Sequence, residues 1–212
     1  MIRTTFILLL FVLPFLSQSK DPFNRFIYCR DTLGGTYEKQ CVDLKPDGTG
    51  ESRFKRRGAD EAVSTVALSA PGRDRFLSVI AGTKNLEDRQ KYESKRRVAN
   101  LGRKHLTLEM ASEKREAEFN YSDLKEVIVL TTFFDGLIHQ LTFAQDLESA
   151  IRYERLSVPE RLEQLQADLK SGRIGDPHAM IPVLEKVVQD QRILEYARQH
   201  AQQMVSQIQV SK

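Results

Sequence analysis

Residues 122–153 read SDLKEVIVLTTFFDGLIHQLTFAQDLESAIRY, and this stretch decides the fold that the sequence predicts. Its apolar side chains mostly recur every three or four positions, with Thr131 filling the gap between Val127 and Phe134, and this spacing places them on one side of an α-helix. Ser122 is a good N-cap residue, and Asp123 puts a negative charge in the first turn, where a helix favours it. The pattern predicts one long amphipathic helix. The members of its apolar stripe are Leu124, Val127, Phe134, Leu137, Leu141, Ala144, Leu147 and Ile151.

A second interpretation of the same stretch is a buried strand followed by a helix. Residues 126–134, EVIVLTTFF, are rich in β-branched and aromatic side chains, which favour strands. We prefer the helix because no proline or turn cluster bounds this run. The stripe also continues in helical phase beyond Gly136.

Residues 1–19 have the features of a signal peptide. Arg3 gives a positive start, residues 6–16 form an apolar core, and Ser-Gln-Ser before Lys20 suits a cleavage site. The apolar core is short for a membrane span, although an uncleaved anchor is the alternative. We therefore expect an exported protein, located in the periplasm or outside the cell.

The two cysteines of the sequence, Cys29 and Cys41, are expected to form a disulfide after export. Residues 33–36, LGGT, are a turn signal between two strand-like runs. A redox-active pair is the alternative, but the C-x-x-C spacing is missing. A hairpin centred on Gly35 would pair Cys29 with Cys41, Tyr28 with Val42, and Phe26 with Leu44.

The remaining patterns predict an α+β protein. Residues 20–121 read as an antiparallel sheet of about six or seven short strands, because the links between them are short. Residues 122–212 read as the long helix and two further helices, packed on the sheet. The strands after the hairpin are expected at residues 51–56, 62–68, 97–101, 104–110 and 115–121, with a short helix at residues 70–82.

The two C-terminal helices have clear start signals. Ser157 and Pro159 begin the first, and Asp176 and Pro177 begin the second, which has a possible break near Asp190. The apolar residues of the tail, including Leu194, Met204 and Ile208, could pack on the same domain or on another copy.

Catalytic and metal-binding motifs are not found in the sequence, so we expect neither an enzyme nor a cofactor. The four histidines, His105, His139, His178 and His200, are scattered singly. His139 is the one to inspect, with a boundary histidine as the simpler interpretation. Asp43, Asp47 and Glu51 resemble a calcium loop, but Lys45 and Phe54 occupy positions that require ligands, so no metal is expected.

The charge distribution is the most unusual feature of the sequence. Residues 53–115 hold sixteen basic and eight acidic residues, a balance of +8, whereas residues 116–168 hold four basic and eleven acidic residues, a balance of −7. One interpretation is that the two charges compensate where the helices meet the sheet. The other is a basic surface for an anionic partner. Its candidate residues are Arg53, Lys55, Arg56, Arg57, Lys95, Arg96 and Arg97.

Three hypotheses for function follow. The first is an exported, non-enzymatic protein whose basic β half binds an anionic envelope polymer, a lipid surface or an acidic protein. Nucleic acid is not expected as the partner, because the chain is exported and the basic runs lack interleaved aromatic residues. The second is a structural or assembly component of the cell envelope that acts through the helical half. The third is a hydrolase with an unrecognised site, although no carboxylate pair stands out and the chain has no Trp.

Overall fold

The computed structural model describes residues 23–32, 34–86, 92–100 and 102–210, and the signal peptide predicted for residues 1–19 lies outside this part of the chain. The predicted α+β class is confirmed. The strands are β1 (Arg25–Asp31), β2 (Tyr37–Leu44), β3 (Thr49–Arg56), β4 (Glu61–Ala67), β5 (Lys104–Glu109) and β6 (Lys114–Phe119). The α-helices are α1 (Ala70–Gly82), α2 (Lys125–Tyr153), α3 (Val158–Lys170), α4 (Ile181–Gln189) and α5 (Glu195–Val210). Short 3-10 helices are η1 (Lys84–Leu86), η3 (Arg155–Ser157) and η4 (Pro177–Met180).

The six strands form one antiparallel sheet in the order β4-β3-β2-β1-β5-β6. The predicted register of the first hairpin is confirmed, since Cys29 pairs with Cys41 and Tyr28 pairs with Val42. The predicted disulfide joins the two cysteines, with an S–S distance of 2.07 Å. A structural disulfide is typical of an oxidising compartment, so it indicates the periplasm or the cell exterior.

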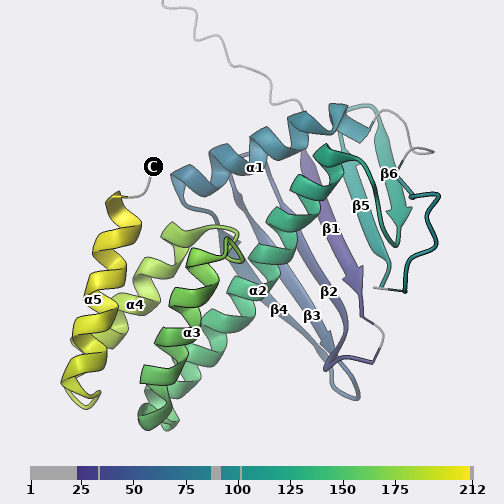
Figure 1. Ribbon diagram of the computed structural model, residues 1–212. Coiled ribbons are helices and arrows are strands. Elements are labelled where there is room, and N and C mark those ends of the chain that lie inside the picture. The colour runs from purple at the N-terminus through teal and green to yellow at the C-terminus, as the bar shows by residue number, and fades with distance from the viewer. Residues whose placement is uncertain (1–22, 33, 87–91, 101, 211–212) are drawn as a thin grey trace, which may run out of the picture.

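One face of the sheet is covered by α1 and α2, and no described helix lies on the opposite face (Figure 1). The strand period of two sends Phe26 and Tyr28 of β1 to the covered face. Both rings stack on Phe134 of α2, with ring centroids 5.2 and 5.1 Å apart, respectively. Phe76 of α1 packs edge-on against the same ring of Phe134. These aromatic contacts form the centre of the core between sheet and helices.

The long helix α2 belongs to two hydrophobic cores. Its first half, including Leu130 and Phe133, is buried against the sheet and α1. Its second half, including Leu147 and Ala150, is buried against α3, α4 and α5. Figure 1 shows α2 crossing the sheet and continuing into the group of C-terminal helices. Within the described chain, α2 alone is long and apolar enough to cross a membrane, but half of its most apolar window is buried, as in the core helix of a globular fold.

The strand interpretation of residues 126–134 is wrong, because these residues lie within α2. The predicted cap is also wrong, since the helix begins at Lys125 with Leu124 at the N-cap position. Ser122 is buried, and its hydroxyl instead accepts a hydrogen bond from Leu124 N at 3.3 Å. Burial of the aromatic residues in the core outweighs the small intrinsic preference of this composition for strand.

One further expectation needs correction. Residues 97–100 form a loop and not a strand. Hydrogen bonds hold this segment to the residues that follow β6, since Ser94 N donates to Tyr121 O and Asn120 Nδ2 donates to Ala99 O.

The possible break near Asp190 is confirmed, so the last predicted helix is divided into α4 and α5. Asp190 stabilises the break by accepting hydrogen bonds from the backbone and side chain of Arg192.

Residues 173–176 fasten the C-terminal helices to the rest of the molecule. Gly175 lies against α2 so closely that a Cβ on it would be 2.6 Å from Leu137 N. Arg75 of α1 donates to Gly175 O at 3.4 Å. Asp176 is buried and accepts hydrogen bonds from Ser69 N and Ser69 Oγ at the start of α1. The sheet half and the helical half are therefore held together through this loop.

Candidate functional site

The predicted basic residues of β3 divide into two groups. Arg53 lies on the open face of the sheet, where Nη2 is 3.0 Å from Glu51 and 3.9 Å from Asp43. Lys55, Arg56 and Arg57 lie at the end of β3. The Arg56 guanidinium stacks over the ring of Tyr37 at 5.1 Å, and Lys55 Nζ donates to Ala59 O.

The second basic run, Lys95 to Arg97, lies in the loop beside the end of β6. β3 and β6 are four strand spacings apart in the sheet, which is about 19 Å at the usual spacing. Arg96 faces Asp123, with Nε 3.6 Å from Oδ1. The structure therefore does not bring the two basic runs together on one continuous patch.

Charge compensation between sheet and helix is seen at Asp135 of α2. Its Oδ1 accepts hydrogen bonds from Arg30 Nη1 at 3.0 Å and from Tyr28 Oη at 2.8 Å. Burial raises the pKa of Tyr28 well above its usual value, and the nearby Asp135 carboxylate raises it further. Arg30 of β1 and Asp135 of α2 thus neutralise one another where the helix meets the sheet, although Arg30 lies outside the basic stretch of residues 53–115.

The end of the helical bundle farthest from α1 presents a different kind of surface. The α2–α3 turn and the α4–α5 turn lie side by side there (Figure 1), and Arg155 Nε is 3.8 Å from Asp190 Oδ2 between them. Leu156 is 85% exposed and Tyr153 is 80% exposed, which is unusual for large apolar side chains. Leu194 of the second turn and Tyr196, in the first turn of α5, are exposed as well. We call the four residues Tyr153, Leu156, Leu194 and Tyr196 the bundle-end patch.

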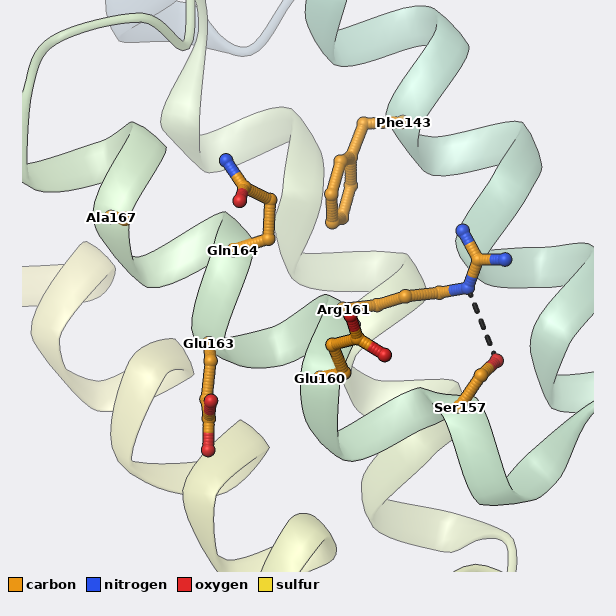
Figure 2. A pocket seen from close by; sticks show the side chains of 7 residues that line it. All are labelled: Phe143, Ser157, Glu160, Arg161, Glu163, Gln164 and Ala167. Carbon is orange, nitrogen blue, oxygen red and sulfur yellow. Dashed lines mark hydrogen bonds between the residues drawn. The ribbon is translucent and has the colours of Figure 1, made fainter.

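A groove with a volume of about 500 Å³ begins beside the bundle-end patch and runs between α2 and α3. Phe143 and Gln164 face each other across it, and the Arg161 side chain lies at its lower end (Figure 2). Arg161 is held in place because its Nε donates to Ser157 Oγ at 3.3 Å and its Nη2 is 3.4 Å from Glu154. The groove thus combines an aromatic wall with an amide and a tethered guanidinium. Its lining residues are Phe143, Ser157, Glu160, Arg161, Glu163, Gln164 and Ala167.

His139 lies one turn of α2 before Phe143, and the centroids of the two rings are 6.3 Å apart. Its Nε2 is 2.7 Å from Oδ2 of Asp168, a carboxylate that is completely buried. Gln164 and Arg173 also bind this carboxylate. A buried acid can orient a catalytic imidazole, but acyl-transfer chemistry also needs a nucleophile. In the described chain no hydroxyl or thiol is hydrogen-bonded to His139, so the arrangement serves to fix α2, α3 and residue 173 to one another.

The bundle-end patch is not predicted by the sequence pattern. Leu194, one of the apolar tail residues predicted to pack, is exposed, because the break at Asp190 restarts the helix and Ile193 takes the buried position. Of the two alternatives for the tail, packing on the same domain holds for Met204, Val205 and Ile208, which are buried in the core of the helical half. One signal in the sequence could have indicated the patch: Tyr153 and Leu156 lie at the end of the long helix and belong neither to its apolar stripe nor to that of the next helix.

Comparison of the sequence with protein-family models finds no matching family, and comparison with curated proteins finds no relative.

Proposed function

We propose that this is an exported, non-enzymatic protein that binds a partner protein through the bundle-end patch and the adjoining groove. The observation that carries the proposal is the exposure of Leu156 and Tyr153, at 85% and 80%, in a turn that also begins the groove wall. The predicted signal peptide and the disulfide support export, since cross-linked cysteines suit an oxidising compartment. This proposal corresponds to the structural or assembly role expected for the helical half.

The side chains at the bundle end suit protein recognition. Tyrosine and arginine are enriched among the residues that dominate protein–protein binding, and they act best beside pockets that an apolar anchor can fill. Here Arg161 and the ring of Phe143 line the groove, and Tyr153 and Tyr196 are exposed at the same end of the bundle. An apolar side chain of the partner would pack on Phe143, while the Gln164 amide and Arg161 bind backbone or polar groups at the rim.

The charges of the bundle end argue for a protein and against an anionic lipid surface. Binding to such a surface needs a net positive charge close to the apolar side chains. Residues 152–156 and 190–196 contain three arginines and three carboxylates, so their charges balance. Asp190 is also paired with both Arg155 and Arg192.

Site-specific photo-crosslinking in the native cell tests the proposal. A photoreactive amino acid at position 156 should give one discrete adduct, whereas the same group at position 63 should give none. Val63 is the matched control, because it is also an exposed apolar residue but lies on β4, away from the helices. The adduct partner, once identified, is purified and titrated against the intact protein.

The affinity of the crosslinked protein for variants of this chain tests whether the bundle end is the binding site. We expect Leu156→Asp to weaken binding at least tenfold, since removal of a central apolar anchor typically costs more than about 1.4 kcal/mol. Val63→Asp should leave the affinity unchanged. Equal crosslinking at both positions, or equal affinities of both variants, would show that the bundle end is not the binding site.

Binding of an anionic partner through the β half is a second proposal, and one observation favours it. Lys39 and Lys55 are direct cross-strand neighbours on the open face, an arrangement that repulsion normally disfavours. Arg56 and Arg57 follow immediately, although Glu61 of β4 lies opposite Lys55. Sedimentation with anionic vesicles or with an acidic polymer at two salt concentrations tests this proposal. Binding that fails to weaken with salt, or no binding at all, would contradict it.

A further inference from the structure

The open face of the sheet contains a pocket that is separate from both surfaces described above. Its volume is about 560 Å³, and it lies over β2, β3 and β4 next to the turn that joins β2 to β3. Its charged and hydroxyl-bearing lining residues are Arg25, Asp43, Lys45, Thr49, Glu51, Arg53 and Thr65. Three cations and two carboxylates therefore surround a space large enough for a small organic molecule.

Both carboxylates of the pocket already have arginine partners. Asp43 is only 8% exposed, and Arg25 binds it through Nε at 2.7 Å and through Nη2. This bond raises the pKa of Arg25, so its guanidinium stays charged. Glu51 accepts a hydrogen bond from Arg53 Nη2 at 3.0 Å. The negative charge at the floor of the pocket is thus largely neutralised by groups that still have further N–H donors.

Lys45 adds a third positive charge at the mouth of the pocket. No hydrogen bond or ion pair joins its ammonium group to the described residues, although its charge also acts on the neighbouring Asp47 carboxylate. The turn that carries it is rigid: Gly48 has φ +84°, Lys45 N donates to Thr49 O at 2.8 Å, and Asp47 accepts two hydrogen bonds from Thr49. A fixed backbone keeps the base of this side chain beside the pocket, so only the side chain itself has to be ordered on binding.

We infer that this pocket binds a small anion with a carboxylate or phosphate group between Lys45 and Arg53. Arginine suits such a group because its planar fork can donate two parallel hydrogen bonds, and lysine adds a point charge. The Thr65 hydroxyl, which also lines the pocket, can donate to a third oxygen. The inference is independent of protein binding at the bundle end, because the pocket lies on the sheet.

Titration of the full, ¹⁵N-labelled protein with inorganic phosphate and with succinate tests the inference by amide NMR. Saturable shifts should be confined to the neighbourhood of Lys45, Arg53 and Thr65. Lys45→Gln should weaken the affinity about fivefold, whereas Glu51→Gln should strengthen it by a similar factor, as expected for partly exposed charges. Arg57→Gln is the matched control, since it removes an exposed cation outside the pocket and should change nothing.

The opposite signs of the two pocket variants separate binding from any loss of structure, because misfolding could only weaken binding. Shifts that do not saturate with either anion, or that respond equally to Lys45→Gln and Arg57→Gln, would overturn the inference. A third titration uses vesicles of phosphatidylglycerol. Binding to vesicles without any response to the free anions would also overturn it, because the ligand would then be a lipid surface.

Discussion

Asp176 binds Ser69, the N-cap residue of α1, which lies 107 positions away in the sequence. Its carboxylate accepts hydrogen bonds from Ser69 N at 2.7 Å and from Ser69 Oγ at 2.6 Å. Asp176 occupies the N-cap position of its own short helix, η4, yet makes no side-chain cap there. Ser69 in turn caps α1 by accepting from Gly72 N at 3.1 Å. One buried carboxylate therefore connects the C-terminal helices to the sheet half of the molecule.

Asp176→Ala should destabilise the protein by about 2 kcal/mol, because it leaves the Ser69 N–H and hydroxyl without an acceptor in a buried site. Urea unfolding followed by circular dichroism measures the change. Asp74→Ala is the control, since Asp74 is an exposed residue of α1 and should alter stability by less than about 0.5 kcal/mol. Equal effects of the two variants would show that the Asp176–Ser69 contact contributes little.

Gly175→Ala should cost at least about 2 kcal/mol, because the added Cβ would lie 2.6 Å from Leu137 N and 2.8 Å from Phe133 O, which backbone cannot easily vacate. Gly82→Ala is the matched control at the end of α1, where a Cβ meets nothing within 4 Å. That variant should be neutral or slightly stabilising. A stable Gly175→Ala variant would contradict the close contact between residue 175 and α2.

Removal of the disulfide should lower the free energy of unfolding by about 3 kcal/mol, the typical effect for a loop of this length. The double variant Cys29→Ala, Cys41→Ala is compared with the oxidised parent by urea unfolding. The change should be similar when the parent is unfolded in the presence of a thiol reductant, since reduction removes the same covalent link. No loss of stability in either experiment would mean that the bond is unimportant for the sheet.

Tyr28 should make stability fall at alkaline pH. Its pKa is raised in the folded state, so the neutral phenol is favoured by folding. That contribution is complete below the unfolded pKa of 10.0 and is lost as the pH rises towards the folded value. Above pH 10 the parent should lose about 1.4 kcal/mol per pH unit more than Tyr28→Phe, which has no phenol to ionise. Parallel pH profiles for the two proteins would contradict this assignment.

The sequence predicted the features that depend on local pattern. Apolar spacing predicted α2, and the alternation around Cys29 and Cys41 predicted the register of the first hairpin, because both are set by a period of 3.6 or 2 residues. The roles of Asp176 and Gly175 could not be predicted, since they depend on contacts between distant segments. The sequence predicted Asp176 as the cap of the helix that follows it, whereas in the structure its carboxylate binds Ser69 at the start of α1.

The candidate site was predicted less well for the same reason. Charge counts show an excess of basic residues, but not that β1, β2 and β5 separate β3 from β6. The bundle-end patch arises where the α2–α3 and α4–α5 turns meet in space, with Leu156 in one and Leu194 in the other. The spacing of residues in the sequence does not show that these two turns lie side by side.

The most direct test of the central claim is the affinity for the partner crosslinked at position 156, measured by calorimetry with purified components. The account predicts saturable binding by the parent and by Val63→Asp with equal affinity, and at least tenfold weaker binding by Leu156→Asp. Unfolding curves should show that both variants are as stable as the parent, because both positions are exposed. Undiminished binding by a stably folded Leu156→Asp variant would contradict the claim that the bundle end is the binding site.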